Sequence, residues 1–436
     1  MAINQKLGQP AEGTREGAAA GLAPALPRAA RLTQGFRALG VRNYRLFWFG
    51  QLISLIGTWM QTTAQAWLVY QLTNSPLALG VVTTVQSLPI MLLSLFGGAI
   101  ADRVPRYRLI LITQIAALVQ AALFGALVGF GVIQLWHVYV LALALGVITA
   151  IDTPVRQAFV VELVGRDQRP NAIALNSMLF NSARIVGPAV AGMLIARLGI
   201  APAFYLNALS FIGVLGALLM MDRSTFRPPP PPAETSIVRG IAEGLAYIWR
   251  TPTVLLIMSA VAVIGTFGYN FNVVLPLLAG FVLHTDSQGF GLLSAMFGAG
   301  SLVGALSTAY APQVSMRRLL LGGAAFSLIF AGLAVSSIIS VSGALLLALG
   351  CAGIIFTTSA NTLIQLHVPD ELRGRVVSLY FLLFAGSTPI GGMLIGTLST
   401  SLGVTPTLLL CAAICLAGIA AVGAYRQRLA AVSPEA

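Results

Sequence analysis

The chain has 436 residues, of which 57% are apolar and only 9% are charged, and its mean hydropathy is +0.88. A soluble protein of this length would need far more charge, so the composition excludes an ordinary water-soluble domain and indicates a chain whose solvent is mostly lipid. The formal net charge of +12 raises the question of nucleic acid, which the positions of the basic residues answer below.

Long apolar runs follow one another along the chain. Twelve of them are long enough to cross a hydrocarbon core of about 30 Å, which takes roughly 20 helical residues. The sequence therefore predicts an all-α membrane protein with twelve transmembrane helices in two six-helix bundles. The predicted spans lie near Tyr44 to Tyr70, Leu77 to Ala101, Leu109 to Phe130, His137 to Phe159, Ala172 to Ala196, Ala201 to Met221, Val254 to Val282, Phe290 to Ala311, Leu319 to Ile339, Ser342 to Leu366, Val376 to Leu398 and Thr407 to Tyr425.

Polar stretches divide the chain into five parts. Residues 1–43 are predicted to be a disordered cytoplasmic tail and residues 44–221 an N-terminal six-helix bundle. Residues 222–253 form a predicted cytoplasmic linker, in which a stiff proline run precedes an interfacial amphipathic helix from Ile237 to Trp249. Residues 254–425 then form the C-terminal bundle, and residues 426–436 a second cytoplasmic tail.

The basic residues lie almost entirely on one side of this predicted topology. All but two of the 25 lysines and arginines fall in the termini or in even-numbered connections; the exceptions are Arg184, inside a span, and Arg197, in an opposite loop. By the positive-inside rule, both termini are cytoplasmic. This distribution also explains the net charge without nucleic acid, so the expected partners are the lipid bilayer, protons and a small-molecule substrate, and the chain is expected to be a monomer.

A repeat relates the two halves. Six residues around the exit of the fourth span recur in the same order around the exit of the tenth: Thr149, Thr153, Glu162, Leu163, Gly165 and Arg166 reappear as Thr358, Thr362, Glu371, Leu372, Gly374 and Arg375. Internal repeats in a membrane chain are typical of transporters, in which two similar bundles move about a site near the midplane. The halves are therefore predicted to be pseudo-symmetric, with Asp152 and Asn361 facing one central cavity.

The residue inventory excludes several chemistries. The single lysine, Lys6, lies in the predicted tail, so the bundles hold neither a Walker A lysine nor a Schiff-base lysine. The three histidines lack metalloprotease spacing, and two cysteines of the last span, Cys411 and Cys415, are better explained as packing residues than as a metal site. We therefore expect no enzyme activity, no metal and no cofactor.

Polar stripes on the spans are the candidate site. Asp152 and Arg156 lie on the fourth span, and the equivalent polar residues of the tenth span are uncharged. On the first span, Gln51, Ser54, Thr58, Gln61, Thr62 and Gln65 fall within an arc of about 100°. Either the stripe forms interhelical hydrogen bonds or it is a cavity wall, which three glutamines favour. The predicted substrate path is Gln51, Thr58, Gln61, Gln65, Asn270, Asn361 and Thr362.

Arg184 lies about midway along the fifth span. An arginine there costs roughly 2.5–3.5 kcal/mol on insertion scales, so it needs a partner or water. Asp152 is the best candidate partner, because the arginine leans toward the cytoplasmic end of its helix. Two interpretations stand side by side: a structural ion pair, and a functional group that is either a proton-sensitive latch or an anion-binding cation.

The loop between the second and third spans carries a family resemblance. Gly98, Asp102, Arg103, Arg106 and Arg108 resemble a loop motif of the major facilitator superfamily, although Pro105 replaces the usual glycine. The resemblance implies a cytoplasmic gate made by Gly98, Asp102, Arg103 and Arg106. Arg184, Gly187, Pro188 and Gly192 resemble part of a glycine-proline motif of the superfamily's antiporters.

Five further segments resemble the secretion-effector branch of that superfamily, which includes siderophore exporters and drug efflux pumps. They begin at Asn43, Gly57, Asp152, Asn207 and Val368 and spread over nearly the whole membrane region. The resemblance implies a secondary transporter of the bacterial inner membrane that exports a small amphipathic molecule in exchange for protons. Asp152, Arg156 and Arg184 are then the predicted coupling residues. The alternatives are a proton-coupled importer and a non-transporting sensor or partner protein.

Overall fold

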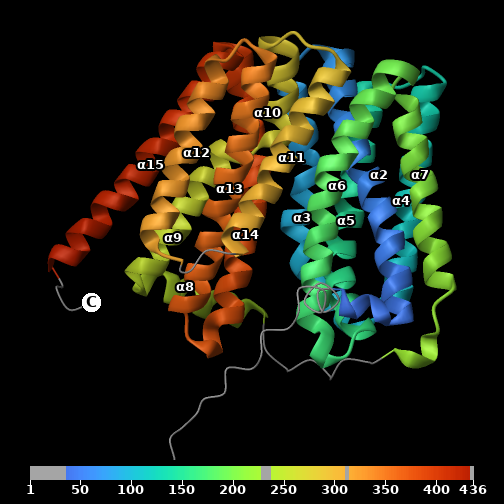
Figure 1. The fold of residues 1–436 in the computed structure, drawn as a ribbon, viewed down its shortest axis with the longest axis horizontal. Helices are drawn as coiled ribbons and strands as arrows, with labels where there is room; N and C mark the ends of the chain where they lie inside the picture. The colour runs from blue at the N-terminus through green and yellow to red at the C-terminus, as the bar shows by residue number, and fades with distance from the viewer. Residues whose placement is uncertain (1–35, 227–236, 310–313, 433–436) are drawn as a thin grey trace, which may run out of the picture.

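The computed structural model describes residues 36–226, 237–309 and 314–432, and for 94–103, 166, 237–239, 309 and 430–432 it describes the backbone alone. Most of the predicted N-terminal tail and the proline run of the linker lie outside these residues. The described part consists of helices and their connections and contains no strand. Figure 1 shows these helices as two side-by-side bundles, the first in blue to green and the second in yellow to red.

The first bundle contains six long helices and short 3₁₀ turns. The long helices are α2 (Arg42–Thr73), α3 (Pro76–Arg103), α4 (Arg106–Gly129), α5 (Leu135–Leu163), α6 (Arg169–Leu198) and α7 (Ala201–Leu219). An amphipathic helix, α8 (Ile237–Arg250), then precedes the second bundle. Its Glu243 side chain forms an ion pair with Arg375 of the second bundle.

The second bundle repeats the pattern, with one broken helix. Its members are α9 (Pro252–Val263), α10 (Phe271–Leu277), α11 (Ser287–Ala309), α12 (Met316–Val335), α13 (Ile339–His367), α14 (Asp370–Leu402) and α15 (Val404–Val432). The last helix therefore continues beyond the predicted end at Tyr425. Gly199 and Gly403 end the equivalent helices α6 and α14 in the left-handed region, at φ +83° and +87°, as expected of a duplicated helix end.

The seventh span is broken where the sequence predicts one continuous helix from Val254 to Val282. Two π-helical turns, at Ile264–Gly268 and Leu278–Val282, flank the short helix α10. Pro276 cannot donate a backbone hydrogen bond, and Gly265 and Gly268 stabilise the helix poorly. Such turns often occur at functional sites, and here they place Asn270 and Asn272 at the centre of the molecule.

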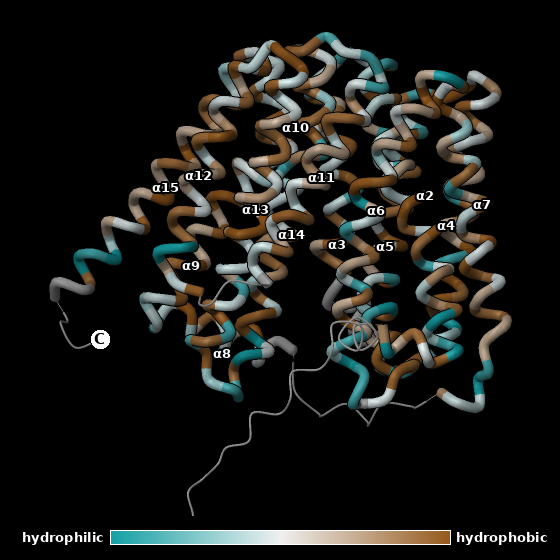
Figure 2. The backbone as a smooth tube through the Cα atoms, viewed as in Figure 1, coloured by the Kyte–Doolittle hydropathy of each residue, from teal (hydrophilic) through white to brown (hydrophobic). Residues whose placement is uncertain are grey.

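Eleven segments of the described chain, one of them the broken span, are long and apolar enough to cross a membrane. The twelfth long helix, α2, spans 32 residues, but its polar stripe lowers its hydropathy. Figure 2 shows apolar segments along the middle of the helices and hydrophilic ones gathered toward the end where α8 lies. The fold is therefore the predicted membrane protein of two similar bundles.

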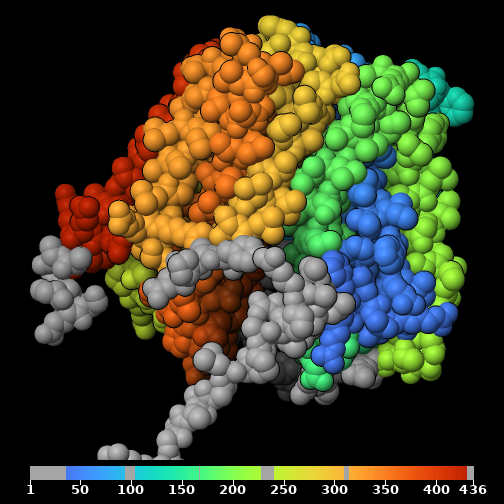
Figure 3. Space-filling view, in the orientation of Figure 1, coloured from blue at the N-terminus to red at the C-terminus, as the bar shows by residue number. Residues whose placement is uncertain are grey.

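Helix ends define two faces. The basic face is the end that carries α8 and the first residues of α2, and it holds Arg42, Arg106, Arg169, Arg250, Arg317 and Arg373. The opposite end, which holds Arg197, is called the distal face. The halves meet along two equivalent seams, α3 against α14 and α6 against α11. Figure 3 shows α11 lying directly against α6.

Glycines bring the seams into backbone contact near the distal face. A Cβ added at Gly80 of α3 would lie 2.5 Å from the carbonyl oxygen of Gly392 in α14, and one added at Gly192 of α6 would lie 2.9 Å from the Cα of Gly291 in α11. No larger residue fits without moving backbone. The two halves are thus closed against each other at the distal face.

Candidate functional site

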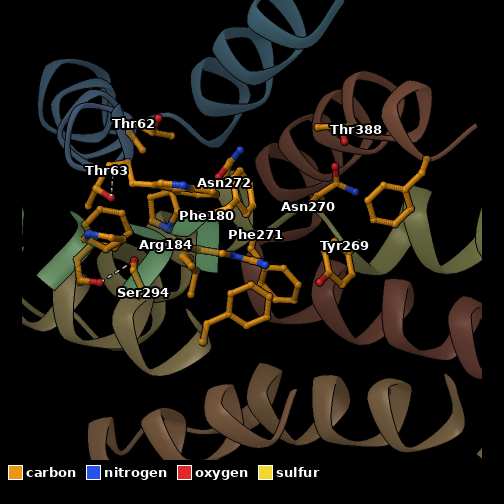
Figure 4. Close-up of a pocket in the computed structure, with 18 residues that line it drawn as sticks. Thr62, Thr63, Phe180, Arg184, Tyr269, Asn270, Phe271, Asn272, Ser294 and Thr388 are labelled. Carbon is orange, nitrogen blue, oxygen red and sulfur yellow. Dashed lines mark hydrogen bonds between the residues drawn. The ribbon is translucent and has the colours of Figure 1, made fainter. Parts of the chain in front are cut away.

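Two connected cavities lie between the bundles. The first, here called the aromatic cavity, has a volume of about 290 Å³ and lies near the middle of the helices. Figure 4 shows its polar side chains and Arg184 set among rings. Its aromatic wall is made by Trp59, Phe180, Tyr269, Phe271, Phe290, Phe297 and Phe384.

The second, here called the acid cavity, has a volume of about 310 Å³. It continues from the first through Trp59, Thr62, Phe180 and Asn272, which line both. From there it extends toward the basic face, past Asp152, Thr153, Arg156 and Asn176. Because the seams close the distal face, the combined site is reached from the basic face.

Asp152 is the acid of this site, and its carboxylate is held by three groups. One oxygen, Oδ1, accepts hydrogen bonds from Thr113 Oγ1 at 2.6 Å and from Gln114 Nε2 at 2.9 Å. The other, Oδ2, lies 3.3 Å from Nη2 of Arg156, one helical turn away. The residue is only 6% exposed. A carboxylate so buried is stable because it is paired and hydrogen-bonded, and protonation would remove its attraction to the arginine.

Arg156 joins this pair to the first span. Its Nη1 donates to Gln51 Oε1 at 2.9 Å. The predicted Asp152–Arg156 pair is therefore present. Gln51 was expected on the cavity wall, but it is only 2% exposed, and its side chain instead accepts the hydrogen bond that positions Arg156.

Arg184 does not reach Asp152, contrary to the sequence-based expectation. Its guanidinium lies 4.7 Å from the ring centroid of Phe297 on α11 and 5.8 Å from that of Trp59 on α2. The reason is the packing of α6, which lies mainly against α2 and α11 rather than against α5, so a side chain on this face meets the second bundle. Among the described residues it has no ion pair and no hydrogen bond, and it is the only charged side chain on the aromatic cavity.

Some residues of the polar stripe of α2 line the cavities, and others form hydrogen bonds between helices. Thr58 and Thr62 line the cavities, and Gln65 lines a side pocket, where it donates to Gln86 at 2.9 Å. Gln61 is 1% exposed and lies within the first bundle, where it accepts from Asn207 at 2.7 Å and donates to Gln120 at 3.0 Å. An arc of about 100° is wide enough to face a cavity on one edge and neighbouring helices on the other.

The second bundle contributes different chemistry. Asn270 lines the aromatic cavity as predicted, but Asn361 and Thr362 line neither central cavity. Asn361 instead accepts a hydrogen bond from Gln365, which is exposed. The position equivalent to Asp152 therefore carries no charge and lies on neither central cavity.

Of the four predicted gate residues, the structure describes the side chain of Arg106 alone. The backbone of Gly98, Asp102 and Arg103 belongs to α3, but their side chains lie outside the described residues, so their role stays a prediction. Arg106 lies 3.8 Å from the carboxylate of Glu162, which joins the start of α4 to the end of α5 within one bundle.

Two features escaped the sequence analysis. The first is Asn272, which lines both central cavities and the side pocket. The second is a group of aromatic side chains that packs between the bundles toward the distal face. Trp67 of α2 stacks on Phe290 of α11, with the ring centroids 5.3 Å apart, and Tyr70 packs edge-on against Phe281, with the centroids 5.4 Å apart. The asparagines on either side of Phe271, in an apolar run containing Gly and Pro, were the available signal for the first.

Comparisons with known proteins agree with this geometry. The family described as transmembrane secretion effector, of the major facilitator superfamily, matches residues 33–435. The staphyloferrin A transporter of Staphylococcus aureus is 25% identical over 83% of this chain and 91% of its own length. The multidrug efflux pump Tap of Mycolicibacterium fortuitum is 28% identical over 88% of this chain and 96% of its own length.

A solved structure supports the fold alone. A bacterial homologue of the lysosomal transporter Spinster, crystallised in an inward-facing, unoccupied conformation, superposes with a TM-score of 0.69. The match has 14% identity over 87% of this chain and 95% of that one.

Proposed function

Because the chain belongs to the transmembrane secretion effector family, we propose that this transporter exports a small amphipathic molecule in exchange for protons. The observation that carries the proposal is Asp152, an acid held by an arginine on the wall of a cavity between two bundles. Ionisable groups inside membrane spans are costly and mark proton or substrate pathways.

The proposed orientation places the basic face in the cytoplasm of a bacterium, with the protein in the inner membrane and both termini inside. The arginines of the basic face, against one on the distal face, support it. In this orientation the cavity is open to the cytoplasm and sealed toward the outside, the state that would load an export substrate. The transporter is proposed to work as a monomer, with lipid around both bundles.

The coupling step is an equilibrium between two states of Asp152. With the carboxylate charged, Thr113 and Gln114 hold α5 to α4 through their hydrogen bonds to Asp152. Arg156 of α5 pairs with the same carboxylate and donates to Gln51 of α2. A proton arriving from the outer side neutralises the carboxylate and frees the arginine, which changes the relative free energy of the two states of the bundles. Release of that proton to the cytoplasm restores the pair, so one inward proton accompanies each outward substrate.

The cavity chemistry supports an amphipathic substrate. Aromatic walls with a few hydroxyls and amides suit a molecule with an apolar body and a polar edge better than a sugar. The two relatives named above are described as transporting a siderophore and drugs, and both kinds of molecule belong in the first panel of test compounds.

Purified protein in liposomes tests the function and its direction together. A radiolabelled panel of siderophores and drugs is added outside vesicles with an acidic lumen and, in parallel, outside vesicles with an alkaline lumen. Antiport drives uphill accumulation only into the acidic lumen, with alkalinisation of the lumen as protons leave. Accumulation only into the alkaline lumen would instead mean proton symport and an importer, and no gradient-dependent flux for any compound would mean a non-transporting protein.

A further inference from the structure

The aromatic cavity holds one positive charge that nothing in the described chain neutralises. Arg184 makes no ion pair and no hydrogen bond there, and its guanidinium packs against the rings of Phe297 and Trp59. The acid cavity next to it holds an aspartate and an arginine, which neutralise each other. The combined site therefore carries a net charge of one positive unit.

This charge has consequences for what can fill the cavity. Water can solvate the guanidinium while the cavity is empty, but a ligand that fills the cavity expels that water. A neutral apolar ligand would then leave the cation buried and unpaired, which is costly, and a cationic ligand would add repulsion. An anion with oxygen acceptors would pair with the guanidinium, in a charge-assisted interaction stronger than neutral hydrogen bonds.

Four of the remaining polar groups of the wall offer acceptor oxygens. Thr62, Thr63 and Ser294 donate their hydroxyl protons to the carbonyl oxygens of their own helices, each at 2.9 Å, so their oxygens still have lone pairs for a ligand. Asn270 is 1% exposed and uses its amide nitrogen on two carbonyl oxygens, at 2.8 and 3.1 Å, while its Oδ1 has no partner. A complementary ligand therefore carries its own hydroxyl or N–H donors.

We propose that Arg184 is the anion-binding residue of the transport site, and that the substrate is an amphipathic monoanion with a carboxylate, an apolar or aromatic body and at least one hydroxyl or N–H donor. The carboxylate pairs with Arg184, the body lies against the aromatic wall, and the donor meets the hydroxyl oxygens of Thr62, Thr63 or Ser294. Figure 4 shows Arg184 extending across the cavity toward Phe271 and Tyr269, from the first bundle to the second. This inference rests on the proposed function only in taking the central cavity as the substrate site.

Calorimetric titration of the detergent-purified protein at pH 7.5 tests it without any gradient. The probes are 2-hydroxy-4-phenylbutyrate, its uncharged primary amide, and 4-phenylbutyrate, which lacks the hydroxyl. We expect the wild type to bind the hydroxy acid about tenfold or more tightly than the amide, the difference that one charge-assisted interaction gives. 4-Phenylbutyrate should bind more weakly than the hydroxy acid but still more tightly than the amide.

Two variants of Arg184 and a matched control test whether Arg184 causes the preference for the acid over the amide. Arg184→Gln should bind acid and amide equally, Arg184→Lys should keep part of the preference, and Arg197→Gln, on the same helix but exposed at the distal face, should keep all of it. Equal binding of acid and amide by the wild type, no binding of the acid at all, or a preserved preference in Arg184→Gln would each overturn the proposal. Because binding needs no gradient, a failure of proton coupling would leave these results unchanged, so the two proposals fail separately.

Discussion

The two bundles share a sequence repeat around the fourth and tenth spans, yet they contribute different parts of the site. The first bundle holds the ionisable groups, Asp152, Arg156 and Arg184, on α5 and α6. The second has Asn361 where the first has Asp152, and supplies the broken seventh span and most of the aromatic wall. The two bundles share a helix packing, but the ionisable groups of the site lie in the first and most of its aromatic surface in the second.

The seam between the bundles should be the most sensitive place to break this arrangement. Gly80→Ala adds one methyl group 2.5 Å from a backbone oxygen of the other bundle. Overpacking of this kind costs about 1–3 kcal/mol, which lowers the equilibrium population of the state closed at the distal face by about 5- to 150-fold relative to the other state. Transport should slow as a result. Spin-label distances between the distal ends of α3 and α14 should lengthen.

Gly216→Ala is the matched control for that change, because a Cβ at Gly216 meets nothing within 4 Å. It should leave both the distances and the transport rate as in the wild type. If Gly80→Ala behaves the same way, the closed distal seam does not take part in the transport cycle.

Two variants of the first span compare a residue that holds the bundle together, Gln61, with a residue that lines the cavity, Thr58. Gln61→Leu leaves Gln120 and Asn207 without their shared partner, and a buried polar group without a partner costs about 1–3 kcal/mol. We expect a clearly lower unfolding temperature. Thr58→Val, which removes only a hydroxyl bonded to its own helix, should unfold within a degree or two of the wild type. Equal melting of the two variants would contradict this division.

The smallest effect is expected from an ion pair of the second bundle. Arg373 Nη2 lies 2.5 Å from Asp370 Oδ1 on α14, but the Asp370 side chain is 81% exposed, so water screens the pair. Asp370→Asn should change the free energy of unfolding by no more than about 0.5 kcal/mol and leave transport within about twofold of the wild type. A larger loss of transport, at unchanged stability, would mean that this ion pair takes part in gating.

The fold was predictable to a greater extent than the site. Hydropathy predicted twelve spans, and the repeat predicted two similar bundles, because lipid imposes length and polarity on each helix separately. Contacts between helices depend on rotation about the helix axis. The sequence placed Asp152 and Arg156 one turn apart on one helix, which sufficed to pair them, whereas Arg184 was assigned the wrong neighbour because nothing local indicates that α6 faces α11.

The second bundle shows the same limit. Equivalence in the repeat predicted that Asn361 faces the cavity, but its side chain accepts a hydrogen bond from Gln365 one turn along its own helix and lies on neither central cavity. The breaks in the seventh span depend on π turns, which Gly and Pro permit but do not specify. The asparagines beside Phe271 therefore indicated a polar site in this span, but not that Asn272 lies where the cavities meet.

We propose that proton coupling depends on the first bundle alone, and one comparison of two variants tests this most directly. Asp152→Asn and, at the equivalent position, Asn361→Ala are reconstituted in liposomes and compared with the wild type for accumulation driven by a pH gradient and for exchange of labelled substrate without a gradient. We expect Asp152→Asn to lose accumulation while keeping exchange, and Asn361→Ala to keep both. If Asp152→Asn still accumulates substrate against its gradient, the acid of the first bundle is not the coupling site and the division between the bundles is wrong.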